Sequence, residues 1–381
     1  MPSAGNRAVY KVAGVDVAAG ERAVELMRAA VESTRRPEVL GGLGGFAAAV
    51  ALPAGLRDPV LVSATDGVGT KTAIAASLRR FDTIGRDLVA MCADDVVCSG
   101  AAPLFFLDYV AVGLLEPSEV AELVGGVAAG CRDAGCALVG GETAEHPGLI
   151  DAGAFDLAGC CVGVVERDRI IDPARVRIGD AIIGLASSGL HANGYSLVRA
   201  LIASWDLDLN RPYQEQLVLS LGDAARDAAM AAEPERELAT LGDVLLEPST
   251  IYTKMILGLR EVLDAAGSEL RGVAHITGGA LPGNIPRMLP PGFAARLDPA
   301  RWPVPSVIGL IAALAGIDDE ESRSTFNAGL GMTIVVPREV VPLAIDAIQA
   351  AGPRAWLVGE VVDAAVAGPT RYVEGALEAR T

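Results

Sequence analysis

The stretch PVLVSATDGVGTKT, residues 59–72, passes from an apolar strand pattern through a glycine loop into an alanine-rich segment with helical character. Glycines let backbone amides approach a ligand closely, and the start of a helix favours an anion. The loop is not a Walker P-loop, because Thr70 stands where that motif needs the glycine before Lys71. Taken alone, the stretch indicates either a phosphate-binding loop or a plain tight turn.

Around this stretch, strand and helix patterns alternate through the first half of the chain. The expected strands are residues 59–64, 104–112, 137–140 and 155–165, and the expected helices are residues 20–34, 84–99 and 117–134. This alternation predicts a layered α/β (α+β) domain. The charged stretch 166–169 and the following Asp172-Pro173 predict a boundary between domains at 1–168 and 169–381.

The second half has the same mixed character. The expected elements are strands at 180–186, 272–276 and 332–336, helices at 194–204 and 303–315, and an edge strand after residue 364. The polar segment 206–237 has helical character only at 223–232, and we interpret it as a variable surface excursion rather than a catalytic lid. A second α/β domain is therefore predicted.

Composition limits the possible partners and location. The 381 residues suffice for two to three domains, and a formal charge of −17 disfavours a nucleic-acid partner while leaving small anions possible. No apolar run reaches the roughly 18 residues of a membrane span, and Met1–Lys11 lacks a signal-peptide pattern, so we expect a cytoplasmic protein. The six cysteines form no Cys-x-x-Cys pair and are expected to be reduced core thiols rather than metal ligands or disulfides.

Three carboxylates indicate a metal site. On the expected helix 84–99, Asp95 lies at the centre of an apolar face, and Asp94 lies at its edge, where simple solvation by water is one alternative. A carboxylate buried without a partner is costly, so Asp95 is expected to meet a metal or donors, or to form a structural ion pair. Glu142 follows another strand that ends in two glycines. Asp66, Asp95 and Glu142 together suit Mg²⁺, which takes oxygen ligands and shares substrate phosphates.

Glycine-containing loops also occur elsewhere. ASSGLHANGYS, residues 186–196, joins a strand to a helix with groups that suit a phosphate monoester, although an ordinary capped turn stays open. Residues 277–280 form a similar loop, and the glycine-rich 41–46 is either a mobile loop or a linker. The sequence shows no Ser-His-Asp order, zinc-type histidine pair or dinucleotide fingerprint, so hydrolase, zinc and NAD functions lack support.

In their order along the chain, these motifs resemble those of the phosphoribosylformylglycinamidine cyclo-ligases, the AIR synthetase family. The resemblance covers nearly the whole chain. The matching stretches are residues 10–11, 13–16, 34–39, 41–46, 66–71, 82–85, 103–109, 140–145, 191–199, 251–252, 275–279 and 325–327. The chain departs from the family pattern at Val12, Asp94, His146, Ala280 and Gly283.

The resemblance implies a two-domain AIR-synthetase-like fold, with ATP and Mg²⁺ bound by the N-terminal domain and the substrate by the C-terminal domain. The N-terminal sheets of two subunits pair in such proteins, which implies a homodimer with ATP near the interface. The implied nucleotide set is Gly42, Gly44, Asp66, Gly67, Gly69, Thr70, Lys71, Asp94, Asp95, Gly140, Gly141 and Glu142. The implied substrate set is Ser188, Gly189, His191, Asn193, Gly194, Thr277, Gly278 and Gly279.

The same resemblance implies a reaction. ATP phosphorylates the formyl oxygen of formylglycinamidine ribonucleotide, and ring closure expels phosphate to give 5-aminoimidazole ribonucleotide in de novo purine biosynthesis. Asp66, Asp95 and Glu142 are the implied metal ligands; Lys71 is the implied catalytic cation, and His191 binds the substrate phosphate or moves a proton. Two alternatives stay open, a small-molecule kinase of the same superfamily and a nucleotide-binding protein without activity.

Overall fold

The computed structural model describes residues 16–42 and 44–377. The matching stretch 10–11, the departure at Val12, residues 13–15 of the stretch 13–16 and Leu43 of the stretch 41–46 lie outside the described residues. The chain divides into two compact units. Unit 1 contains residues up to Val96 together with Ala101–Asp168, and unit 2 contains Val97–Gly100 and the residues from Arg169 onward. Both units combine sheets with helices, which confirms the predicted fold class.

Unit 1 is built on a four-stranded sheet in the order β3-β6-β4-β5. Its strands are β3 (Pro59–Gly67), β4 (Ala102–Val112), β5 (Ala137–Glu145) and β6 (Phe155–Glu166). Helix α5 (Pro117–Ala134) returns the chain from β4 to β5, so these two strands are parallel, whereas β6 pairs antiparallel with β3 and β4. Pro117 is the first residue of the helix, a position that proline favours, and Gly135 caps its end with a φ of 82°, a conformation that glycine favours.

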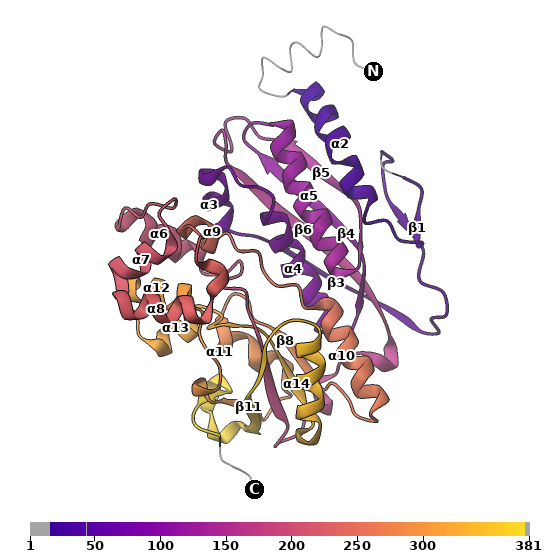
Figure 1. Cartoon of the computed structure of the whole chain (residues 1–381). Coiled ribbons are helices and arrows are strands. Elements are labelled where there is room, and N and C mark those ends of the chain that lie inside the picture. Colours follow the sequence, from indigo (N-terminus) through magenta and orange to yellow (C-terminus); the bar gives the residue numbers. More distant parts are fainter. Residues whose placement is uncertain (1–15, 43, 378–381) are drawn as a thin grey trace. The chain divides into compact units, whose positions relative to one another are not determined.

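Within the described residues, helices cover one face of this sheet and leave the other open. α2 (Val17–Glu32) packs on α5, and α4 (Ile84–Val97) lies on the same side, with α3 (Lys71–Leu78) following β3 (Figure 1). Along β4, Phe106 and Val110 are buried, whereas the alternate residues Leu107 and Tyr109 are exposed. The open face therefore carries apolar side chains.

The glycine-rich stretch 41–46 lies between two short strands. β1 (Val39–Leu40) and β2 (Ala49–Val50) pair antiparallel, with Val39 opposite Val50. Gly41 and Gly44 adopt positive φ values of 86° and 102°, which glycine tolerates without strain. The stretch is thus the turn of a small ribbon rather than a linker.

Unit 2 is built on a six-stranded sheet in the order β12-β9-β11-β7-β10-β8, with β12 at an edge. Its strands are β7 (Ala181–Ala186), β8 (Gly272–His275), β9 (Phe293–Leu297), β10 (Leu330–Val336), β11 (Ala355–Asp363) and β12 (Tyr372–Glu374). All neighbours are antiparallel except β12 and β9. Ile183 and Leu185 of β7 enter one buried cluster and Ile182 enters another, so both faces of the sheet are covered.

Helices of unit 2 supply the remaining core. They are α6 (Tyr195–Ser204), α7 (Tyr213–Leu221), α8 (Asp223–Ala232), α9 (Leu241–Leu245), α10 (Thr253–Ala265), α11 (Ala280–Asn284), α12 (Ser306–Ala315), α13 (Asp319–Thr325) and α14 (Val341–Ala350). α10 and α14 contribute apolar side chains to the cluster around Ile183. None of the helices in residues 16–42 and 44–377 has the length and apolar character that crossing a membrane requires.

Segment 206–237 is more ordered than its sequence suggests. The predicted helical part, 223–232, is confirmed as α8, but α7 precedes it. α7 buries Tyr213 and Leu217 and contacts α12, so the interpretation of the segment as a surface excursion is wrong for this part. Leu217 is buried whereas Leu219 is exposed, so the apolar run 217–219 does not by itself show which face of α7 packs.

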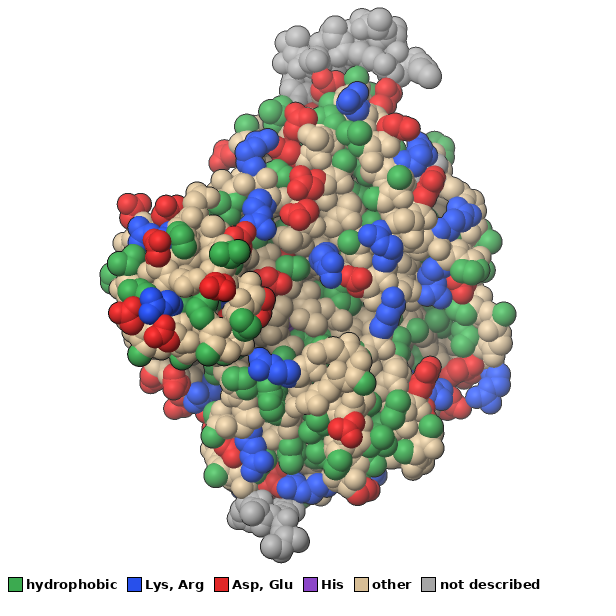
Figure 2. Space-filling model, viewed as in Figure 1, with side chains coloured by type: hydrophobic (Ala, Val, Ile, Leu, Met, Phe, Trp, Pro, Cys, Tyr) green, Lys and Arg blue, Asp and Glu red, His purple; other side chains and the backbone are tan. Residues whose placement is uncertain are grey.

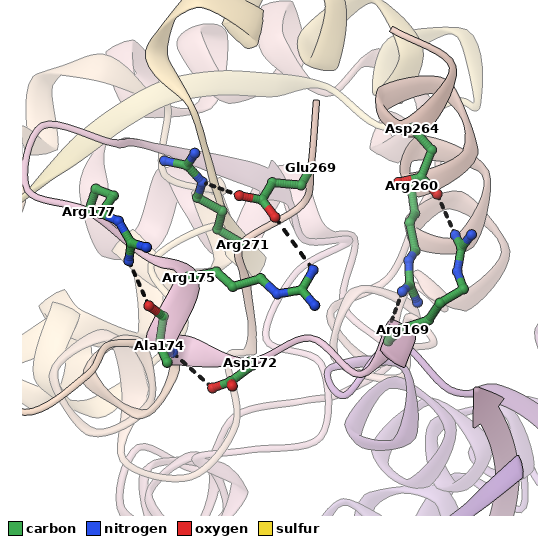
Figure 3. A network of polar contacts seen from close by, with 9 residues as sticks. All are labelled: Arg169, Asp172, Ala174, Arg175, Arg177, Arg260, Asp264, Glu269 and Arg271. Atoms are coloured by element: carbon green, nitrogen blue, oxygen red, sulfur yellow. Dashed lines mark hydrogen bonds and ion pairs between the residues drawn. The ribbon is translucent and has the colours of Figure 1, made fainter. Parts of the chain in front are cut away.

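A polar network fixes the chain where unit 2 begins (Figure 3). Arg260 on α10 donates to the carbonyl of Gly100 at 3.0 Å and to the carbonyl of Arg169. Arg169 in turn pairs with Asp264, and Glu269 pairs with two further arginines. Of the stretch predicted as an interdomain link, Arg169 is therefore held against α10 within unit 2, whereas residues 166–168 belong to unit 1. In Figure 2, acidic and basic side chains are interspersed over the described residues of the visible face.

Candidate active site

Asp66 lies on β3 itself, because the strand continues to Gly67 rather than ending at residue 64. Its neighbour across the sheet is Gly159, which is also opposite Asp108 on β4. Residues opposite one another point to the same face of a sheet, so Asp66 and Asp108 both belong to the helical side. Beyond Asp108 stands Gly141, where an added Cβ would lie 1.7 Å from the Asp108 carboxylate. One row of the sheet thus combines two carboxylates with two glycines.

The environments of the two carboxylates of α4 differ from those that the apolar pattern indicates. Asp94, for which solvation was one alternative, has no exposed surface (0%), whereas Asp95, predicted to lie within the apolar face, is partly exposed. The prediction failed because α4 is enclosed almost all round, with both Val89 and Ala93 buried beside its apolar face. The apolar periodicity of a helix therefore does not predict which of its polar residues is more exposed when the helix is enclosed on most sides.

Cys92 on α4 lies near Asp66, Asp95 and the sheet residue Gly159. Burial raises the pKa of the Cys92 thiol well above its usual range, and the negative charges of Asp66 and Asp95 raise it further. The thiol lies 3.5 Å from the carbonyl oxygen of Gly159. Asp66 and Asp95 are thus close enough to the same thiol to affect its charge, on the helical side of the sheet.

Glu142 faces the other way. It lies within β5, one residue after Gly141, and stands opposite the exposed Tyr109. Because successive residues of a strand alternate between faces, its side chain belongs to the open face. Among the described residues, no group of three His, Cys, Asp or Glu side chains is arranged to hold a metal ion.

Lys71 is wholly buried beneath the glycine loop. Its Nζ lies 2.8 Å from Oδ2 of Asp87 on α4, and both side chains are 0% exposed. The pair joins the first residue of α3 to the first turn of α4. The positive charge of Lys71, which was predicted to face the transferring phosphoryl group, is thus paired with Asp87 in this structure. The contact of Lys71 with phosphate stays a prediction.

The remainder of the first loop is compact. Gly69 has a φ of 66°, and Thr72 donates its hydroxyl to the Gly69 carbonyl at 2.9 Å. Thr70 precedes α3, whose first-turn amides point out of the helix start. Gly67 also leaves little room, since a Cβ there would lie 3.0 Å from the Leu157 carbonyl. These features suit close approach of an anion to the backbone.

In unit 2, the loops predicted to bind the substrate lie at one edge of the sheet. β7 ends at Ala186 opposite Leu330, and β8 ends at His275 opposite Met332, so both strand ends flank the start of β10. The loops that follow, 187–194 and 277–280, approach each other directly. A Cβ added to Gly278 would lie 3.7 Å from Oδ1 of Asn193.

The second of these loops is held by one amide side chain. Nδ2 of Asn284 lies within 3.3 Å of three backbone carbonyl oxygens, those of Thr277, Gly278 and Ala280. Gly279 has a φ of 93°, and the next residue, Ala280, has a φ of 54°. Alanine is strained in this left-handed conformation, which explains why a family pattern has glycine at that position.

His191 lies inside the first loop rather than on its surface. It is 1% exposed and has a φ of 61°. Its Nε2 accepts hydrogen bonds from the backbone amides of Ser188 at 3.2 Å and Thr250 at 3.4 Å. A nitrogen that accepts two amides carries no proton, so in this structure the imidazole organises the loop through Nε2. The contact of His191 with the substrate stays a prediction.

Two residues that the sequence interpretation did not include contact the same loop. Asn327 donates to the Gly189 carbonyl at 2.8 Å, and Arg236 donates to the Ser188 carbonyl at 2.7 Å. Asn327 belongs to a stretch that resembles the family, which was the available indication. Arg236 belongs to segment 206–237 and is one of many arginines in the chain, so no pattern distinguishes it.

Comparison with known proteins defines the class of the fold. It is shared by the hydrogenase maturation protein HypE in complex with ATP, with a TM-score of 0.61 and 18% identity, covering 93% of this chain and 90% of that one. Thiamine-monophosphate kinase from Stenotrophomonas maltophilia K279a has a TM-score of 0.57 and 16% identity, covering 90% and 93% of the two chains. At these identities the likeness concerns the fold.

The sequence comparisons are more specific. The chain belongs to the AIR synthase related protein family, whose N-terminal domain model matches residues 46–165 and whose C-terminal domain model matches residues 177–369. Phosphoribosylformylglycinamidine cyclo-ligase from Gloeobacter violaceus is 49% identical, covering 93% of this chain and 98% of its own. The cyclo-ligase from Sorangium cellulosum is 47% identical, covering 93% and 95%. The resemblance inferred from the motifs is confirmed.

Proposed function

We propose that the protein uses ATP to close the imidazole ring of formylglycinamidine ribonucleotide, releasing ADP, phosphate and 5-aminoimidazole ribonucleotide in purine biosynthesis. The observation that carries this proposal is the 49% identity to a phosphoribosylformylglycinamidine cyclo-ligase along nearly all of both chains. A kinase of the same fold is supported only by likeness at 16% identity. The cytoplasmic location expected from the sequence stays a prediction.

Unit 1 offers the donors for Mg²⁺ and ATP. Mg²⁺ is usually held by one or two carboxylates together with substrate phosphate oxygens, and Asp66 and Asp95, both near Cys92, fit that requirement. Bound Mg²⁺ would neutralise charge on the phosphates during transfer. The loop 67–70 would supply backbone amides to the same phosphates. Glu142 stays a predicted ligand without support from the strand register.

Unit 2 offers the groups for the ribonucleotide. Loops 187–194 and 277–280 present backbone amides and the side chains of Ser188 and Asn193 around one edge of the sheet. Amides at the start of α6 suit a phosphate monoester. In this proposal His191 acts by holding the Ser188 amide and thereby the shape of the loop.

We also propose a homodimer formed through unit 1. The open face of its sheet exposes large apolar side chains on the two strands that flank β6, Leu61 on β3 and Leu107 and Tyr109 on β4. Contiguous apolar surface of this kind is uncommon on monomers and favours a symmetric partner. Stretches 41–46 and 66–71 are expected near the interface. A mass near 39.0 kDa in sedimentation equilibrium at micromolar concentration, with full activity, would refute the dimer.

The function is tested with purified protein, ATP, Mg²⁺ and formylglycinamidine ribonucleotide. ADP and the ring-closed product should appear in equal amounts, and neither should form without the ribonucleotide. ADP release with thiamine monophosphate instead would support the kinase alternative. Absence of ADP release with both substrates would support a protein that binds nucleotide without turnover.

A further inference from the structure

The loop 187–194 has two consecutive carbonyl groups that side chains from other segments hold in place. Arg236 Nη2 donates to the Ser188 carbonyl at 2.7 Å. Asn327 Nδ2 donates to the Gly189 carbonyl at 2.8 Å, and Ser187 Oγ donates to it at 2.9 Å. In a trans peptide the N–H points opposite to the C=O. Fixing these two carbonyls therefore fixes the direction of the next two amides, those of Gly189 and Leu190.

Those two amides are left as donors. Gly189 and Leu190 are both buried, and neither backbone N–H donates a hydrogen bond to any residue within 16–42 or 44–377. Buried amides without an acceptor are rare in folded proteins. A backbone N–H group without an acceptor in the protein is a candidate donor to a bound anion. The loop is thus set up to receive an anionic oxygen from outside the protein.

Arg236 is itself rigidly held. It is 8% exposed, and its Nη1 lies 3.0 Å from the Glu233 carboxylate. Glu233 in turn accepts from the backbone amide and the hydroxyl of Ser306, at 2.9 and 2.8 Å, where α12 begins. A planar guanidinium can contact Ser188 and Glu233 at the same time in fixed directions, which a lysine ammonium does less well.

We propose that Arg236 is a positioning residue for the phosphate of the ribonucleotide, acting through the Ser188 carbonyl on the amides of Gly189 and Leu190. The proposal rests on the proposed function for the identity of the phosphate ester. It assigns a role in the substrate site to segment 206–237, which comes from elsewhere in the chain and resembles a surface excursion in sequence. Arg236 also adds a positive charge beside the loop, since a Cβ at Gly189 would lie 3.6 Å from its Nη2.

The test compares Arg236→Met and Arg236→Lys with Arg226→Met, a control in the same segment whose guanidinium forms surface ion pairs with Asp223 and Asp227. Ribose 5-phosphate binding is measured by calorimetry, and steady-state kinetics give KM for both substrates. Loss of a charged hydrogen bond predicts that Arg236→Met weakens ribose 5-phosphate binding and raises the ribonucleotide KM about 10- to 100-fold. Arg236→Lys should show a smaller increase. The ATP KM, and all values for Arg226→Met, should stay within about twofold of wild type.

The inference is overturned if Arg236→Met binds ribose 5-phosphate with the same affinity as the wild type. It is also overturned if the wild type does not bind this ligand at all. If Arg236→Met does not fold, Arg236→Lys decides in the same way, because an unchanged ribonucleotide KM and unchanged ribose 5-phosphate affinity contradict the role. A wild type that binds ribose 5-phosphate but forms no ring-closed product would instead refute the proposed function and leave the inference standing for another phosphate ester.

Discussion

Two loops of this protein look alike in sequence and are held in different ways. Loop 66–71 and loop 187–194 each follow an apolar strand, contain glycines and lead into a helix. The most deeply buried anchor of the first is an ion pair, Lys71 with Asp87, beside a hydrogen bond from the Thr72 hydroxyl to the Gly69 carbonyl. The second is anchored by several hydrogen bonds from side chains to its backbone, including those of Asn327 and Arg236.

Because of this difference, the anchor of the first loop should matter most for folding stability, and the anchors of the second should matter most for the geometry of ligand binding. A buried ion pair concentrates a large free energy in two residues, because removing one partner leaves an uncompensated charge in the core. Hydrogen bonds to a backbone carbonyl contribute less each, but every one sets the direction of a peptide group. Substitutions around loop 66–71 should therefore affect folding most, and those around loop 187–194 should affect substrate binding more than folding.

The largest expected effect is that of Lys71→Met. Asp87 would remain in the core without its partner, so the free energy of unfolding should fall by about 3 to 5 kcal/mol in urea titrations. Arg22→Met on the exposed side of α2 is the control and should change it by less than about 0.5 kcal/mol. The double variant Lys71→Met/Asp87→Leu should recover much of the loss. No recovery would show that the pair is not the cause.

The fold was largely predictable because its strands and helices carry periodic patterns. Helix α5 was predicted with its observed ends, since proline and glycine mark both of them. β3 and β5 run further than predicted, because Asp66 and Glu142 are polar residues at strand ends that pair with neighbouring strands. β9 and β11 were missed, as arginine, glutamate and glycine interrupt their apolar runs.

The site was predictable only where chemistry is local. The glycine loops could be recognised because their residue types are adjacent in the chain. The contact of Arg236 with Ser188 joins residues 48 positions apart, and the burial of Asp94 depends on how elements pack around α4. Such properties arise from tertiary structure, so a single sequence does not contain a pattern for them.

The region around the first loop is also expected to make stability depend on pH, through Asp108. This residue lies in the same row of the sheet as Asp66. It is 9% exposed, its Oδ2 has no hydrogen-bond partner among the described residues, and burial raises its pKa to about 7. The folded state therefore binds a proton that the unfolded state releases near pH 4. The contribution of Asp108 to stability should be fully present below that pH and fall by up to ~1.4 kcal/mol per pH unit as pH rises to about 7.

Asp108→Asn should remove this contribution to the pH dependence, since the amide is neutral throughout, and should make the protein more stable than wild type above pH 7. Asp151→Asn, in the exposed connection between β5 and β6, is the control and should keep the wild-type slope. Urea midpoints between pH 4 and 8 provide the measurement. A slope that is the same in wild type and Asp108→Asn would show that the carboxyl titrates normally.

The smallest expected effect on folding is that of Asn327→Ala at loop 187–194. The variant loses the donor to the Gly189 carbonyl and the acceptor for the Gly329 amide, at 2.8 and 2.9 Å, which should lower the free energy of unfolding by about 1 to 3 kcal/mol. Because the Gly189 carbonyl then depends on Ser187 alone, the amide of Leu190 loses its fixed direction, and the ribonucleotide KM should rise while the ATP KM stays constant. Asn210→Ala, on an exposed turn, is the control. A loss of stability in Asn327→Ala as large as that in Lys71→Met, with an unchanged ribonucleotide KM, would contradict the division between the two loops.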